Sequence, residues 1–375
     1  LTELTGYKHI IPTHQGRASE KILATITVKE GDIIPSNSHF DTTRANFEAA
    51  LATPVDLLCK EGIDLLTPAP FKGNIDLEKL EALLNSDDIE KIPFVLMTIT
   101  NNTGGGQPVS MENLKAVKAL CEKYNKMFLL DACRFSENAW FVSQREESYR
   151  DIEIREIAKE AFRLADGCTI SLKKDGFGNI GGVLAFNDDA LAEAAKNVLI
   201  LTEGFPTYGG LTGRDLDALA QGLIEITDRN YLEYRARSIS YLAEKALEYG
   251  IPIVQPAGGH ALYIDAKTFL PHIPPHQYPG HSLACEIYLI GGVRAVELGT
   301  LAFGVAGEDG KDDTPATHEL VRLAAPRRSY TQSHFDYVAE VLEKLVETKD
   351  KLKGYEIIEQ PQLLRHFTAK LKPLV

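Results

Sequence analysis

The sequence predicts an α/β fold, in which a mostly parallel sheet is flanked by helices and a smaller α/β domain follows. Three observations predict it. Apolar strand-like runs alternate with helical patterns through the first half of the chain, as in parallel sheets. The run at 92–100 is apolar except for threonine and suits a strand buried on both faces. A long helical pattern at 229–249 then precedes a second series of strands. We therefore expect two domains, 1–228 and 229–375.

The elements of the first domain follow from hydrophobic periodicity and turn residues. Ser110 is placed to cap one helix, whose apolar positions Leu114, Val117 and Cys121 share a face. The segment at 32–40 leads into another helix, expected at 45–52. Strands are expected at 9–12, 92–100, 127–130 and 165–172, and helices at 18–25, 45–52, 75–84, 111–124, 154–164 and 188–227, the last interrupted at 204–210.

The second domain has a less regular pattern. A proline-rich stretch at 271–279 and a charged, glycine-rich loop at 307–313 separate its elements. Strands are expected at 251–255, 260–265, 292–298 and 320–324, and helices at 229–249, 282–289 and 335–346.

Composition excludes several classes of protein. The 375 residues carry a net charge of −13 without a lysine- or arginine-rich run, which argues against a nucleic-acid surface. The longest apolar runs have the length of strands, so no membrane span is expected. The five cysteines have no CxxC or metal-ligand spacing, which favours reduced thiols in a cytoplasm.

Polar residues collect at the expected carboxyl ends of the strands, where α/β sheets bind ligands. Gly16, between a strand and a helix start, forms an anion cup to which Arg17 adds a charged fork. Lys173 and Lys174 follow a buried strand, and a partly desolvated lysine beside a second cation can form a Schiff base. Asp131 ends another strand.

A phosphate cup, a lysine and an acid are together what pyridoxal 5′-phosphate (PLP) requires. Asn102 and Arg134 lie at strand ends too. Simpler interpretations stay open at this point: turn glycines are common, paired lysines are usually solvated, and an aromatic residue such as Phe40 is more often core than a stacking platform.

Five motifs extend this interpretation: residues 12–17, 102–110, 131–139, 173–175 and 364–370. On these motifs the chain resembles the β-eliminating lyases, PLP-dependent enzymes of the aspartate aminotransferase-like fold (fold type I). The resemblance implies that Lys174 bears the cofactor and removes the substrate α-proton, and that Asp131 pairs with the pyridinium nitrogen. It implies further cofactor contacts from Gln15, Gly16, Arg17, Phe40, Asn102, Arg134, Ser171 and Lys173. It also implies that Arg322 binds the substrate carboxylate and that the Asn179 carbonyl binds a potassium ion.

The same resemblance bears on the substrate. Family members that cleave tyrosine have an arginine where this chain has Leu298, and they differ at Asp41 and His366, where the chain matches members that cleave L-tryptophan. The expected reaction is therefore β-elimination of L-tryptophan to indole, pyruvate and ammonium. Cleavage of tyrosine or of S-substituted cysteines stays open, as do structural roles for Asp41 as a helix cap and for His366.

The family also implies a homotetramer. Relatives carry a further N-terminal segment before the part that matches Leu1, so we expect the chain to lack it. A PLP-binding chain with little or no activity is therefore a further alternative.

Overall fold

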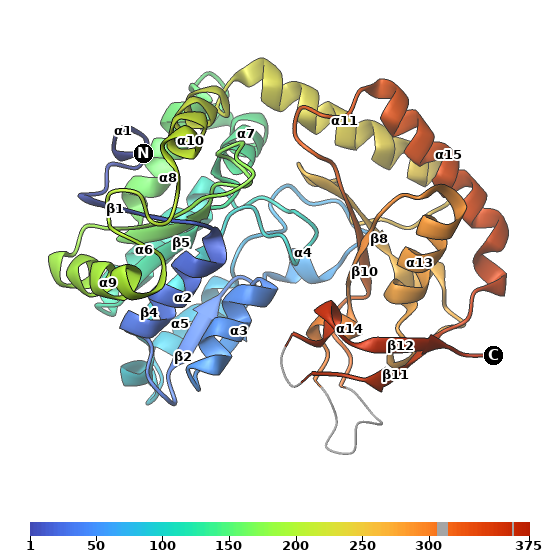
Figure 1. Ribbon diagram of the computed structural model, residues 1–375, viewed down its shortest axis with the longest axis horizontal. Helices are drawn as coiled ribbons and strands as arrows, with labels where there is room; N and C mark the ends of the chain where they lie inside the picture. The colour runs from blue at the N-terminus through green and yellow to red at the C-terminus, as the bar shows by residue number, and fades with distance from the viewer. Residues whose placement is uncertain (306–313, 362–363) are drawn as a thin grey trace. The chain divides into compact units, whose positions relative to one another are not determined.

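The computed structural model describes residues 1–305, 314–361 and 364–375 (Figure 1). The expected loop at 307–313 thus lies outside the described residues. Contacts divide the chain into two compact units: the first contains Leu1–Gly62 and Pro70–Glu233, and the second contains Ile63–Ala69 and Tyr234–Val375. The short segment Ile63–Ala69 therefore belongs to the second unit, although it lies inside the expected first domain in sequence.

The first unit is built on a seven-stranded sheet with the order β1-β7-β6-β5-β4-β2-β3. Neighbouring strands from β3 to β6 are parallel, whereas β7 runs antiparallel to both β6 and β1. The mostly parallel sheet is thus confirmed. The strands are β1 (His9–Thr13), β2 (Ile33–Ser36), β3 (Thr53–Asp56), β4 (Phe94–Thr98), β5 (Met127–Asp131), β6 (Gly167–Ser171) and β7 (Gly182–Phe186).

Helices of the first unit pack on this sheet through apolar faces. Phe47, Phe94 and Phe186 are fully buried in one such core. Ser110 caps its helix as expected, since its Oγ accepts a hydrogen bond of 3.0 Å from the Asn113 amide. The helices are α1 (Thr2–Thr5), α2 (Gly16–Thr27), α3 (Asp41–Ala49), α4 (Lys60–Ile63), α5 (Leu77–Leu84), α6 (Met111–Lys123), α7 (Phe135–Arg145), α8 (Ile154–Leu164), α9 (Asp189–Thr202) and α10 (Gly213–Glu225), with 3₁₀ turns at Ile89–Lys91 and Glu147–Tyr149.

The second unit has a three-stranded antiparallel sheet with the order β8-β10-β9 and a separate hairpin of β11 and β12. Its apolar core includes Leu283 and Leu342 from two covering helices. The strands are β8 (Ala261–Asp265), β9 (Val296–Leu298), β10 (Leu320–Ala324), β11 (Tyr355–Glu359) and β12 (Lys370–Pro373). The helices are α11 (Arg229–Glu248), α12 (Ala266–Phe269), α13 (Pro279–Gly291), α14 (Thr300–Phe303) and α15 (Gln332–Thr348), with 3₁₀ turns at Pro275–Gln277, Lys349–Lys351 and Arg365–Phe367.

Some expected elements differ from those observed. The expected strand at 251–255 is wrong: only Ile253 pairs, in an isolated bridge with Ile264. Helix α3 begins at Asp41, four residues before the expected start at 45, so Asp41 lies in its first turn rather than ahead of it. No helix of the described residues is long and apolar enough to cross a membrane.

Candidate active site

The expected anion cup is the start of α2. Gly16 is its first residue and packs directly on Ser171, the last residue of β6. A Cβ atom at Gly16 would lie 2.5 Å from the Ser171 Cβ and 3.0 Å from its Cα, so only glycine fits. Gln15 pairs with Gly181 in a parallel bridge, which fixes the chain as it enters the helix. The N–H groups of the first helical turn therefore meet a strand end that carries a hydroxyl group.

The two lysines follow Ser171 directly. Lys173 Nζ lies 3.2 Å from Gln15 Oε1, so this lysine reaches the cup. The pKa of Lys173 is lowered by burial and by the nearby charges of Lys174 and Arg17. The cation pairing expected from the sequence is thus present, and it brings Arg17 into the same cluster.

Lys174 itself is half-buried and sits in a tight turn, where its amide donates to the Ser171 carbonyl at 3.2 Å. The next residue, Asp175, is fully buried and accepts hydrogen bonds from Ser136 N at 2.8 Å and Ser136 Oγ at 2.7 Å. Because Ser136 lies in the first turn of α7, these bonds tie the lysine turn to that helix.

The expected acid, Asp131, ends β5 and is 4% exposed. It lies between Thr98 of β4 and Thr169 of β6 in the register of the sheet. The Cys133 amide donates to Asp131 Oδ1 at 3.3 Å, and the Cys133 thiol accepts from the Ser171 amide at 3.1 Å. Acid and anion cup are therefore connected through one residue.

Arg134 and Asn102 also lie at this edge of the sheet. The Arg134 amide donates to the Ile99 carbonyl at 3.1 Å, which places Arg134 beside the end of β4. Asn102 is 2% exposed in the turn after β4. The next residue, Thr103, donates through Oγ1 to the His39 carbonyl at 3.1 Å, so this turn is joined to the one that carries Phe40 and Asp41.

Hydrogen bonds to Asp56 hold the turn before α3, where His39 is buried and Asp56 is exposed. His39 Nδ1 lies 2.7 Å from Asp56 Oδ1, and Arg44 donates to Asp56 Oδ2 at 2.6 Å. Desolvation alone would raise the pKa of Asp56, but the hydrogen bond and charge of His39, together with Arg44, lower it overall. Phe40 caps α3 immediately after this anchor, and Asp41 Oδ1 accepts from the Thr42 amide at 2.5 Å.

The sequence analysis missed one residue of the site, Glu20. It is buried on α2, and its Oε2 accepts a hydrogen bond of 2.6 Å from Thr42 Oγ1. Burial and the charges of Asp131 and Asp41 together raise the pKa of Glu20 to about 7, against the lowering effects of the Thr42 hydrogen bond and Lys174. A carboxyl group on α2 is thus electrostatically coupled to the acid and to the lysine. Its spacing from Gly16, four residues along the helix, was the available signal.

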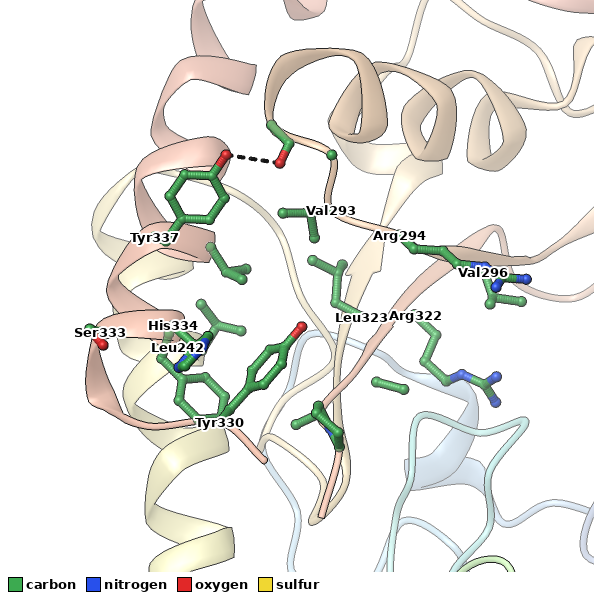
Figure 2. Close-up of a pocket in the computed structure, with 17 residues that line it drawn as sticks. Leu242, Val293, Arg294, Val296, Arg322, Leu323, Tyr330, Ser333, His334 and Tyr337 are labelled. Atoms are coloured by element: carbon green, nitrogen blue, oxygen red, sulfur yellow. Dashed lines mark hydrogen bonds between the residues drawn. The ribbon is translucent and has the colours of Figure 1, made fainter. Parts of the chain in front are cut away.

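Two expected substrate residues, Arg322 and His366, belong to the second unit. Arg322, on β10, lies opposite Tyr263 of β8 and Val296 of β9. It lines a cavity of about 610 Å³, in which Arg294 and Arg322 extend toward one end and Tyr330 lies toward the other (Figure 2).

The remaining expected residues differ in exposure. Leu298 is 5% exposed and packs with Leu65 and Tyr263. His366 is half-buried, with its ring 4.1 Å from that of Phe367. Asn179, expected to bind potassium through its carbonyl, is exposed. Within the described ranges, no three histidine, cysteine, aspartate or glutamate side chains are grouped to hold a metal ion.

The first unit therefore brings together a glycine cup, a lysine and a carboxylate at neighbouring strand ends. These groups fit the phosphate, the aldehyde and the pyridine nitrogen of PLP, and the helix start can lie this close to Ser171 only because Gly16 has no side chain. The fold and the site define a PLP-dependent enzyme of fold type I.

Comparison with known proteins identifies the family. The family model described as beta-eliminating lyase matches residues 1–341, and the chain belongs to this family. It is 56% identical to a tryptophanase of Hyphomonas neptunium and 57% identical to one of Rhodobacter capsulatus, in each case over all of this chain and 82% of the relative. A tyrosine phenol-lyase of Pasteurella multocida is 47% identical over all of this chain and 81% of its own length.

Among solved structures, a complex of SepCysS with the N-terminal domain of SepCysE has the same fold. It aligns with a TM-score of 0.56 and 15% identity, over 93% of this chain and 83% of that chain. The aspartate aminotransferase-like fold expected from the sequence is confirmed, and the protein is a PLP-dependent lyase.

Proposed function

We propose that this enzyme cleaves L-tryptophan by β-elimination into indole, pyruvate and ammonium. The observation that carries the substrate is Leu298, a buried apolar residue where tyrosine-cleaving relatives have an arginine for the phenol oxygen. Indole has no such oxygen and suits an apolar wall. The higher identity to tryptophanases, 56–57% against 45–47% for tyrosine phenol-lyases, supports the same choice.

PLP, when bound, supplies an aldehyde for the substrate amine and a ring that withdraws electrons from the α-carbon. Lys174 holds that aldehyde and then removes the substrate α-proton at its Nζ. Its neighbour Lys173 and Arg17 make a cationic cluster beside it, in which burial and the charges of Lys174 and Arg17 lower the pKa of Lys173. Asp131 would keep the pyridine nitrogen protonated, because a buried carboxylate stabilises a pyridinium charge.

The other first-unit residues bind and orient the cofactor. Gln15, Gly16 and Ser171 hold the phosphate, with Arg17 as a charged fork and Lys173 as a second cation. Phe40 would stack on the ring, and Asn102 and Arg134 would bind its phenolic oxygen. Glu20, whose pKa of about 7 allows either protonation state near neutral pH, adjusts the charge around Asp131.

On the substrate side, the Arg322 guanidinium forms a bidentate pair with the α-carboxylate. Asp41 and His366 orient the indole ring. We further propose that residues 1–228 form the cofactor domain and residues 229–375 the domain that carries Arg322 and His366.

Potassium binding, assembly and location are also proposals. The Asn179 carbonyl would be one ligand of a potassium ion. A homotetramer is supported by large exposed apolar side chains on the first unit, Leu201 at 87% and Phe205 at 60% exposure. The reduced state of the cysteines supports a cytoplasmic location.

The test is product analysis with PLP-loaded protein. Indole release from L-tryptophan should exceed phenol release from L-tyrosine by at least about 10-fold in kcat/KM, since an apolar pocket rejects an added hydroxyl group by up to about 100-fold. Comparable efficiency on the two substrates contradicts the role of Leu298. Efficient cleavage of S-methyl-L-cysteine alone identifies an S-substituted cysteine lyase instead, and PLP binding without turnover identifies a silent chain.

A further inference from the structure

A buried polar network in the second unit surrounds the short helix α14, which follows Leu298 after a single glycine. Glu297, the central residue of β9, accepts a hydrogen bond of 3.1 Å from the Leu301 amide. Glu319, just before β10, accepts from the Thr300 amide at 3.1 Å and also from the Thr300 hydroxyl group. The two carboxyl groups, 7% and 1% exposed, thus bind the first amides of α14.

The glycine between Leu298 and α14 has no room for a side chain. A Cβ atom at Gly299 would lie 2.7 Å from Glu297 Oε1 and would also collide with Glu319 Oε2. The two carboxyl groups therefore lie against the backbone of Gly299 and fix the direction in which the chain continues after Leu298.

The other end of α14 is held by Arg365. Its guanidinium donates to the Thr300 carbonyl at 2.6 Å, to the Leu301 carbonyl at 3.0 Å and to the Gly304 carbonyl at 3.4 Å. Arg365 is 8% exposed, and it immediately precedes His366. The position of His366 is thereby linked to that of Leu298 through one short helix that polar groups bind at both ends.

We propose that Glu297, Glu319 and Arg365 are positioning residues for substrate specificity, which hold Leu298 and His366 in register through α14. This inference rests on the proposed function, in which Leu298 and His366 face the indole. None of the three residues needs to contact substrate, because each acts through the backbone that carries the two specificity residues.

The ionisation of the carboxyl groups agrees with this role. Burial and the charge of Glu319 together raise the pKa of Glu297 to about 8. Burial raises the pKa of Glu319 to about 7, a value that already includes the lowering by hydrogen bonds from Thr300. At neutral pH a protonated Glu297 resembles glutamine, so Glu297→Gln should preserve the network and Glu297→Ala should not.

The experiment compares two substrates that share the reaction but differ in side chain, L-tryptophan and S-methyl-L-cysteine. Arg365→Met in the PLP-loaded protein should lower kcat/KM for tryptophan by about 10- to 100-fold, as expected for a displaced positioning group. It should leave kcat/KM for S-methylcysteine within about twofold. Arg365→Lys should recover part of the loss, and Lys370→Met, which removes an exposed cation of the same segment, should change neither substrate.

Equal losses on both substrates overturn the proposal, because they indicate a general structural defect. Amide hydrogen exchange provides a readout that does not depend on turnover. Arg365→Met should speed exchange in both 300–304 and 364–369, and Glu319→Ala should do the same from the other end. If the wild-type protein does not cleave tryptophan, the proposed function fails, and hydrogen exchange alone tests whether α14 couples Leu298 to His366. Unchanged exchange at 364–369 in both variants overturns that coupling.

Discussion

The Gly16→Ala substitution tests the anion cup directly. The added Cβ would lie 2.5 Å from the Ser171 Cβ, whereas carbon atoms pack at about 3.5 Å or more, so the helix end and the strand must separate by about 1 Å. Overpacking of this kind costs about 1–3 kcal/mol. If the cost falls on the phosphate site, PLP affinity drops by about 5- to 150-fold.

The chain offers a matched control. Gly213 is the first residue of α10, just as Gly16 is the first residue of α2, but a Cβ at Gly213 meets nothing within 4 Å. Gly213→Ala should therefore leave PLP affinity unchanged. The assay is titration of the apoprotein with PLP, with thermal melting of the apoproteins to detect any general loss of stability. A Gly16→Ala variant that binds PLP as tightly as wild type refutes the close approach of Gly16 and Ser171 as the basis of the cup.

Three further predictions concern the lysines, the acid and a buried carboxyl group. Borohydride reduction followed by peptide mapping should attach the cofactor to Lys174 in wild type and in Lys173→Ala, and label nothing in Lys174→Ala; a label on Lys173 contradicts the assignment. Asp131→Asn should lower kcat by at least about 10-fold in steady-state assays, because a hydrogen bond to a charged group contributes about 1.5–3 kcal/mol, and unchanged kcat excludes a role at the pyridine nitrogen. The folded-state pKa of Glu297, about 8, lies above its usual value of 4.5, so between pH 4.5 and pH 8 the folded protein binds more protons than the unfolded protein. The free energy of unfolding should therefore fall as pH rises through this range, by up to about 1.4 kcal/mol per pH unit. Denaturant unfolding of wild type and Glu297→Gln at pH 6 and pH 9 measures this, with a smaller pH dependence expected in the variant, in which the neighbouring carboxyl group of Glu319 is unchanged.

Periodicity and capping predicted two kinds of element: helices that bury one face, and short strands that are apolar along their whole length. Helix α6 begins after Ser110 as expected, and β4 lies within the apolar run at 92–100. The sequence did not predict α7, because nearly all of its residues are buried and it has no polar face to give a period. It also did not predict β7, a five-residue buried strand that follows a glycine-rich stretch.

The candidate site was predictable where residues follow strands directly, as Asp131 and Lys174 do, because parallel strands end at one edge of a sheet. Glu20 was not predictable in this way, since a glutamate within a helix usually faces solvent. Its burial depends on Thr42, which is distant in sequence. The network around α14 was missed for the same reason: Glu297, Glu319 and Arg365 meet only through the fold.

The assignment of Ile63–Ala69 to the second unit means that this unit is not encoded by one continuous stretch of the gene. Leu65 packs beside Leu298, and the Leu65 carbonyl accepts a hydrogen bond of 2.8 Å from the Gln255 amide. In the same segment, the Ile63 carbonyl lies 3.0 Å from His318 Nε2. A shortened gene product covering only 234–375 would lose these contacts and uncover the apolar side of Leu298. Attempts to dissect this enzyme by truncation would therefore need to supply the heptapeptide separately or graft it through a linker.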